Sequence, residues 1–129
     1  MNVPIKKGML IRHQGHLFTI ADYHERHSGK MKPTVHVLLR DLRDGRSIDR
    51  SLDEILPIEE VSHAYRQFQY LYAKGAARVF MDSESFEEVT LEARHLGGAE
   101  SFLREGDTYR VMFADGNPIA LENPEIGPL

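Results

Sequence analysis

The stretch with the most evident chemical potential is His24–Val37, which reads HERHSGKMKPTVHV. It places Lys30 directly after Gly29, with Arg26 and Lys32 nearby on either side. A lysine ammonium is a compact point charge, and on a narrow loop it can reach phosphates and ribose hydroxyls without a bulky domain following it. Gly29 permits the tight backbone that would expose such a side chain. A surface lysine in a turn is also ordinary, so these residues alone leave its role open.

Two histidine pairs have the spacing of metal ligands, His13 with His16 and His24 with His27. Zinc accepts imidazole nitrogen, but a zinc site usually needs three or four converging ligands. A turn between His13 and His16 would put their rings on different strands, and nothing supplies a clear third ligand. Polar positions on the surface of hairpins explain all four histidines, so we expect no metal and no cofactor.

Signatures of enzymes are missing from the sequence. It contains no cysteine, which excludes a cysteine nucleophile, a thiolate metal site and a disulfide. It contains no G-x-S-x-G, P-loop, G-x-G-x-x-G or H-E-x-x-H motif. The stretch GGAESF could hold an anion ahead of a helical turn, although a helix breaker is the favoured interpretation. We therefore predict that the chain is not an enzyme.

Aromatic residues alternate along one stretch, at Phe68, Tyr70 and Tyr72. Such a stripe could form a stacking platform for single-stranded nucleic acid. In a small β-structure a period-2 aromatic stripe more often belongs to the core, which is the interpretation we favour.

Charge is distributed unevenly along the chain. The 129 residues carry a net charge of −4, yet the first fifty hold ten Lys/Arg against five acids, a balance of +5. The remainder holds six basic and fifteen acidic residues, a balance of −9. A basic half suggests a polyanionic partner, with uneven scatter of charge as the equal alternative. No apolar run could span a bilayer, so we expect no membrane contact and a cytoplasmic location.

The first half is predicted to consist of short strands. Residues 9–20 form two strands around Gln14-Gly15, residues 34–42 alternate in polarity, and Asp44-Gly45 marks a further hairpin turn. Lys30 then falls on a loop between two strands. Residues 51–65 are expected to be an extended crossing segment, with a short helix as the alternative because Pro57 excludes a long one.

The second half is also predicted to be mainly β. Strands flank Lys74-Gly75, ARVFMD and FEEVTL follow, residues 92–105 are the best candidate for a short helix, and a final hairpin turns at Asp115-Gly116-Asn117. Many short strands with frequent turns are typical of small barrels. We expect two domains, residues 1–64 and residues 65–129.

Several stretches together resemble a known family. IKKGMLIRHQGHLFTIADYHERHSGK followed by VHVLLRDLRDGRSIDRSL is similar to the N-terminal domain of bacterial translation elongation factor P. YLYAKGAARVFMDSESFEEVTL and FLREGDTYRVMFADGNPIALENP are similar to its second domain. The resemblance implies an all-β fold, with an N-terminal SH3-like (KOW-type) barrel followed by an OB-like β-barrel.

The resemblance also implies a function. Factors of this family bind the ribosome beside the peptidyl-site tRNA and promote peptide bond formation at proline-rich stalls, without being the catalyst. The expected partners are the ribosome and the peptidyl-site tRNA, and we expect a monomer. The alternative is a general RNA-binding or protein-interaction module on the same two-barrel scaffold.

The family's functional tip is a loop between its third and fourth strands, written P-G-K-G or P-G-R-G. The matching residues here are Ser28, Gly29, Lys30 and Met31, of which the middle two agree with the family. In many members the lysine is extended by an amine-bearing group, so a lysine-modifying enzyme is a further candidate partner. The basic residues expected to contact RNA are Arg26, Lys32, Arg40, Arg43 and Arg46.

The end of the sequence departs from the family. Members usually continue into a third, OB-fold domain, whereas this sequence stops at ENPEIGPL. Either a fragment or a short natural form would explain this, and we favour a fragment that binds ribosomes weakly.

Overall fold

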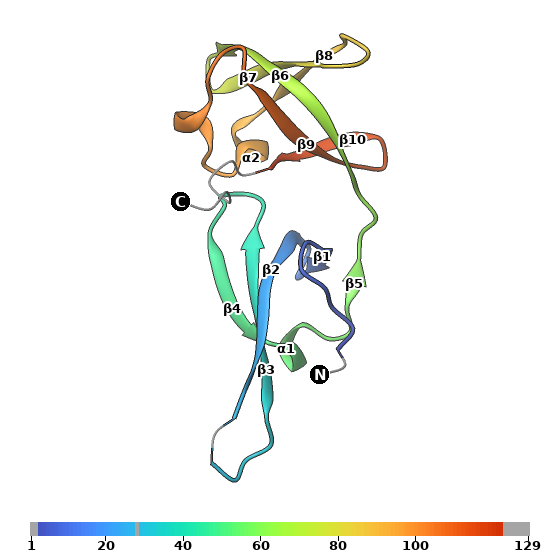
Figure 1. The fold of residues 1–129 in the computed structure, drawn as a ribbon, viewed down its shortest axis with the longest axis vertical. Coiled ribbons are helices and arrows are strands. Elements are labelled where there is room, and N and C mark those ends of the chain that lie inside the picture. Colours follow the sequence, from blue (N-terminus) through green and yellow to red (C-terminus); the bar gives the residue numbers. More distant parts are fainter. Residues whose placement is uncertain (1–2, 28, 123–129) are drawn as a thin grey trace. The chain divides into compact units, whose positions relative to one another are not determined.

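The computed structural model describes residues 3–27 and 29–122, and it consists mainly of β-structure (Figure 1). Ten strands form two five-stranded antiparallel sheets, which confirms the expected all-β fold class. The chain divides into two compact units, the first containing β1 to β5 and the second β6 to β10. No helix within the described ranges is long and apolar enough to cross a bilayer.

The first unit is a single sheet with the strand order β4-β3-β2-β1-β5. Its strands are β1 (Leu10–His13), β2 (His16–Arg26), β3 (Thr34–Asp41), β4 (Ser47–Ser51) and β5 (Glu59–Glu60). The predicted turn between β1 and β2 is confirmed, and both Gln14 and Gly15 have positive φ, at 52° and 77°. That combination matches the right-handed twist of a two-residue hairpin. The core of the unit consists of Ile5, Ile11, Phe18, Ile20, Val37, Leu39 and Ile55.

The expectation of an extended segment from residue 51 is wrong for its first turn. A short helix, α1 (Leu52–Ile55), follows β4 directly. The Ser51 backbone N–H and hydroxyl both donate to Glu54 Oε1, at 2.9 and 3.0 Å. Serine followed three residues later by glutamate is a capping box, a helix-start signal that outweighed the extended character of the following residues.

The second unit has the strand order β10-β9-β6-β7-β8. Its elements are β6 (Ala64–Lys74), β7 (Ala77–Asp82), β8 (Glu88–Leu91), α2 (Ala93–Leu96), the 3₁₀ turn Glu100–Phe102, β9 (Thr108–Ala114) and β10 (Asn117–Leu121). The predicted short helix is confirmed as α2 and the 3₁₀ turn, and the last hairpin turns at Asp115-Gly116 as expected. Strand β8 begins at Glu88, so the expectation that this strand starts at Phe86 is wrong.

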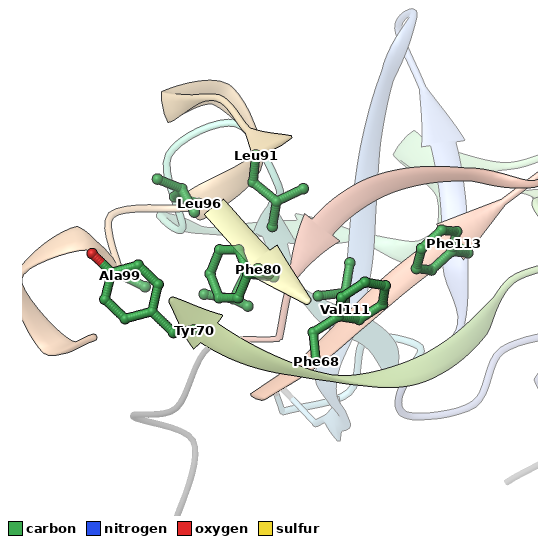
Figure 2. Packing of buried hydrophobic residues seen from close by; sticks show 9 residues of the cluster. Phe68, Tyr70, Phe80, Leu91, Leu96, Ala99, Val111 and Phe113 are labelled. Atoms are coloured by element: carbon green, nitrogen blue, oxygen red, sulfur yellow. The ribbon is translucent and has the colours of Figure 1, made fainter. Parts of the chain in front are cut away.

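The aromatic stripe of β6 is only partly buried. Figure 2 shows Tyr70 beside Phe80, and Phe68 beside Val111 and Phe113, inside the second unit. Tyr72 is 46% exposed, because the pairing of β6 with β7 shifts by one residue between Tyr70 and Tyr72. A bulge of this kind inserts one residue and turns the following side chains to the other face. The core interpretation is therefore confirmed for the first two aromatics and wrong for the third.

Candidate functional site

The loop that carries Lys30 joins β2 to β3 at the end of a long hairpin. The two strands pair from Phe18 with Asp41 to Arg26 with Thr34. Strand β4 accompanies β3 only as far as His36, so the last two pairs of the hairpin have no third strand beside them. We call residues 23–37 the arm, and Figure 1 shows it extending past the other strands of the first unit. The resemblance placed this loop between a third and a fourth strand, whereas here it joins the second and third.

The base of the arm is anchored in the core of the first unit. Val37 is completely buried and lies opposite Tyr23, which packs against the same core. Beyond this pair His24, Glu25 and Arg26 are all exposed. A two-stranded hairpin is marginal by itself in water. The direction of the arm is therefore set by the apolar contacts at its base.

A register shift after Ile20 determines which face of the arm each side chain occupies. The pairing of β2 with β3 skips one residue between Ile20 and Asp22. Before the shift Phe18 and Ile20 are buried, and after it Tyr23 lies on the core side. The bulge thereby turns His24 to the outer face, which it would not occupy in regular alternation.

That outer face carries a polar cluster made by three strands. The rings of His24 and His36 stack with their centroids 5.9 Å apart, and His36 Nδ1 lies 3.0 Å from Asp49 Oδ1. Arg26 Nε donates to His24 Nε2 at 3.0 Å, and its guanidinium lies 3.7 Å from Asp49 Oδ2. The hydrogen bond from His36, followed by the nearby positive charges, lowers the pKa of Asp49 below its ordinary value. Arg26 is thus held along the arm by its neighbours, and sequence reasoning missed this cluster because it depends on the bulge.

At the tip, the structure describes Gly29, Lys30 and Met31, while Ser28 lies outside the described residues. Gly29 has a φ of 57°, in the left-handed region that favours glycine, and a Cβ there would meet no atom within 4 Å. Lys30 is exposed and Met31 is 74% exposed. Within residues 3–27 and 29–122 no ion pair involves Lys30. The ammonium is therefore presented to solvent at the far end of the arm.

The predicted RNA-contacting residues fall into two groups. Arg26 and Lys32 lie beside the tip, as expected from their positions in the sequence. Arg40 lies near the opposite end of β3, six residues from Thr34 and about 20 Å away at the rise of a strand. Arg43 and Arg46 belong to the connection between β3 and β4, at that same end. The structure therefore does not bring the three arginines together with Lys30.

The histidine pairs do not converge on a common centre. His13 and His16 are paired across the first turn, His24 stacks on His36, and His27 lies 3.2 Å from Glu25 Oε1. In the part of the chain that the structure describes, no group of three His, Asp or Glu residues is placed to hold a metal ion.

Two sequence profiles of one family match the chain in succession. The profile described as the Elongation factor P (EF-P) KOW-like domain matches residues 4–54, and that described as the Elongation factor P (EF-P) OB domain matches residues 64–121. The order confirms the predicted KOW-type domain followed by an OB domain.

Curated relatives carry the same name. Elongation factor P of Dictyoglomus turgidum is 35% identical over 119 residues, covering 91% of this chain and 63% of the relative. Elongation factor P of Pseudarthrobacter chlorophenolicus is 30% identical over 120 residues, covering 93% of this chain and 64% of the relative. The chain therefore spans less than two thirds of the length of these relatives.

Solved structures with a similar fold include eukaryotic translation initiation factor 5A from Methanococcus jannaschii, with a TM-score of 0.54 and 19% identity over 92% of this chain and 90% of that one. A translation initiation factor eif-5a family protein from Naegleria fowleri aligns with a TM-score of 0.52 and 15% identity, covering 92% of this chain and 91% of that one. At such identities the likeness concerns the fold alone. The two profile matches, which together account for most of the sequence, show that the chain belongs to the elongation factor P family and contains its KOW-like and OB domains.

Proposed function

We propose that this chain acts in translation, binding the ribosome beside the peptidyl-site tRNA and promoting peptide bond formation at proline-rich stalls. The observation that carries the proposal is the exposed Lys30 at the end of the two-stranded arm. Membership of the elongation factor P family supports it. Because the chain spans about 63% of its relatives, this activity is proposed for the chain and not transferred from them.

The arm suits a partner that is reached through a narrow space between RNA segments. At its last two residue pairs the arm consists of two strands only. Lys30 can therefore enter a gap between RNA segments that is too narrow for the five-stranded sheet. An ammonium group donates charge-assisted hydrogen bonds to phosphate and ribose oxygens. Lys30 would hold the 3′ end of the peptidyl-site tRNA in position, while the ribosome itself makes the peptide bond.

Lys30 is also the proposed site of extension by an amine-bearing group. Its exposure would allow a lysine-modifying enzyme to reach it, and the neighbours Ser28 and Met31 differ from the family's tip sequence. An intact-mass measurement of the protein from its native host, with mapping of the peptide that contains Lys30, tests this directly. An added mass on that peptide supports modification, and an unmodified lysine would mean that its own charge is sufficient.

The proposed function places the protein in the cytoplasm and requires no cofactor. We propose that it acts as a monomer, with the ribosome and the peptidyl-site tRNA as its partners.

A polyproline reporter in a translation system tests the proposed function. Lys30→Ala should abolish the relief of stalling while leaving thermal unfolding unchanged, because the side chain is exposed. Lys30→Arg keeps the charge but removes the amine that an enzyme would extend, so it separates charge from modification. Unchanged reporter synthesis with Lys30→Ala would contradict the proposal.

The matched control replaces the basic group at the other end of β3. The triple variant Arg40→Gln, Arg43→Gln and Arg46→Gln removes three positive charges without altering the tip. We expect it to retain most of the relief of stalling. If it costs as much as Lys30→Ala, a general RNA-binding module that uses its whole basic surface becomes the better description.

A further inference from the structure

The turn between β7 and β8 presents an aromatic side chain to solvent. Phe86 is 69% exposed, and among the large hydrophobic residues of the described ranges only Met31 is more exposed. Its φ is 64°, in the left-handed region. For a bulky aromatic residue this conformation is a genuine outlier, which costs about 1 kcal/mol or more relative to an ordinary backbone.

The surrounding hydrogen bonds explain how this conformation is maintained. The Phe86 N–H donates to the carbonyl oxygen of Asp82 at 2.9 Å, and the Asp82 N–H donates to the carbonyl of Glu87 at 2.8 Å. The first bond is the five-to-one closure that commonly ends a helical turn, where glycine or asparagine usually occupies the left-handed position. A phenylalanine thus stands at a position where the backbone favours glycine.

The buried carboxylate of Asp82 holds this turn in place. Asp82 is 3% exposed, and its Oδ1 accepts hydrogen bonds from the N–H groups of Glu84 at 2.7 Å and Ser85 at 3.2 Å. Its other oxygen pairs with the guanidinium of Arg66 on the neighbouring strand β6. Residues 82–87 therefore form an ordered platform, and the exposure of Phe86 is not the result of a loose loop.

The charge around Phe86 indicates the class of partner. Glu84, Glu87 and Glu88 are all exposed, and the stretch from Ser83 to Leu91 contains no lysine or arginine. The half-exposed guanidinium of Arg66 reaches this turn from β6, but it is paired with Asp82, so the exposed acids still outnumber it. Carboxylates at this density repel a phosphate backbone, so this surface is unsuited to RNA. An aromatic anchor within an acidic rim is complementary to an apolar pocket within a basic rim on a protein.

We propose that Phe86 and the glutamates around it form a protein-docking knob, in which the ring enters an apolar pocket on a basic protein. This inference rests on the proposed function, because a ribosome-bound factor meets proteins that are basic through their own contact with RNA. The strained backbone then has a physical reason: a glycine would fit the turn better, but it could not supply the anchor.

The first test measures binding of the full 129-residue chain to purified 70S ribosomes. Phe86→Gly removes the ring and also relieves the left-handed strain, and an unchanged thermal unfolding midpoint shows that a loss of binding does not come from unfolding. We expect this variant to bind about thirtyfold more weakly, the minimum effect of losing an interface anchor. Phe102→Ala is the matched control, since Phe102 is 50% exposed and lies in the same unit, and it should bind as the unsubstituted chain does.

The second test distinguishes a protein partner from RNA. The double variant Glu87→Lys and Glu88→Lys should weaken binding to a basic protein surface and strengthen binding to RNA. A photoreactive benzoylphenylalanine placed at residue 86 should crosslink to a ribosomal protein, and the same group at residue 102 should crosslink much less.

The outcomes separate the two proposals. If the unsubstituted chain shows no saturable ribosome binding, the proposed function fails and this inference fails with it. If the chain binds but Phe86→Gly binds equally well, or if residue 86 crosslinks only to ribosomal RNA, the docking knob alone is wrong.

Discussion

Replacing Val37 by alanine should destabilise the first unit, because this residue anchors the base of the arm. Val37 is completely buried among Phe18, Ile20 and Leu39. The substitution removes two methyl groups, worth about 1.6 kcal/mol at ~0.8 kcal/mol for each buried carbon group. The cavity left behind adds to this, so we expect a loss of about 2–3 kcal/mol in the free energy of unfolding.

Val35→Ala is the matched control for this prediction. Val35 lies two residues away on the same face of β3 but is only half-buried. The same two methyl groups and the same loss of strand propensity are involved, so the two variants differ mainly in burial. We expect Val35→Ala to cost about half as much as Val37→Ala or less, because the energy follows the apolar area removed from water.

The assay should follow each unit separately, because the chain contains two compact units and need not unfold in one step. Urea unfolding monitored by the amide signals of Leu10 and Leu39 reports on the first unit, and that of Phe80 reports on the second. The midpoint of the second unit should not change with either variant. Equal losses for Val35→Ala and Val37→Ala would refute the argument that the buried base anchors the arm.

Two further predictions concern the tip and the second unit. Gly29→Ala should cost about 1 kcal/mol through the left-handed φ of 57° alone, since a Cβ there meets no neighbour; thermal unfolding checks it, and an unchanged midpoint would contradict it. The pKa of Asp82 is lowered from 3.8, first by the N–H of Glu84. As the pH falls, the carboxylate of Asp82 therefore takes up its proton at a higher pH in the unfolded chain than in the folded one. The stabilisation that this carboxylate provides is present above pH 3.8 and should be lost as the pH falls further. Acid titration of Asp82→Asn should show a weaker loss, and the same acid dependence in both proteins would argue against this role.

Turn chemistry was the most predictable part of the fold. Gln14-Gly15, Asp44-Gly45 and Asp115-Gly116 all mark hairpins, because few residue types adopt positive φ without strain. The family resemblance predicted a functional tip at Lys30, which charge alone did not distinguish from an ordinary turn, and the structure places this residue on an exposed loop. These features could be predicted because they depend on neighbouring residues in the sequence.

The features that escaped prediction depend on strand register and tertiary contacts. The bulges after Ile20 and Tyr70 have no compositional signature, yet each changes which face the following side chains occupy. The polar cluster of His24, His36 and Asp49 follows from the first bulge. Phe86 was expected to begin a strand, and this was wrong. Its left-handed conformation follows from the hydrogen bonds made by the buried Asp82, which the sequence pattern does not indicate.

The central claim, that the arm tip reaches the 3′ end of the peptidyl-site tRNA, can be tested by local cleavage of RNA. Because the chain contains no cysteine, Met31→Cys creates a unique attachment site beside an intact Lys30 for an iron chelate that generates hydroxyl radicals. On ribosomes stalled at consecutive prolines, we predict cleavage of the tRNA near its CCA end from this position, and none there from a control cysteine at the exposed Ser47, which pairs with Arg40 at the opposite end of β3. Cleavage near the CCA end from both positions, or from neither, would contradict the account.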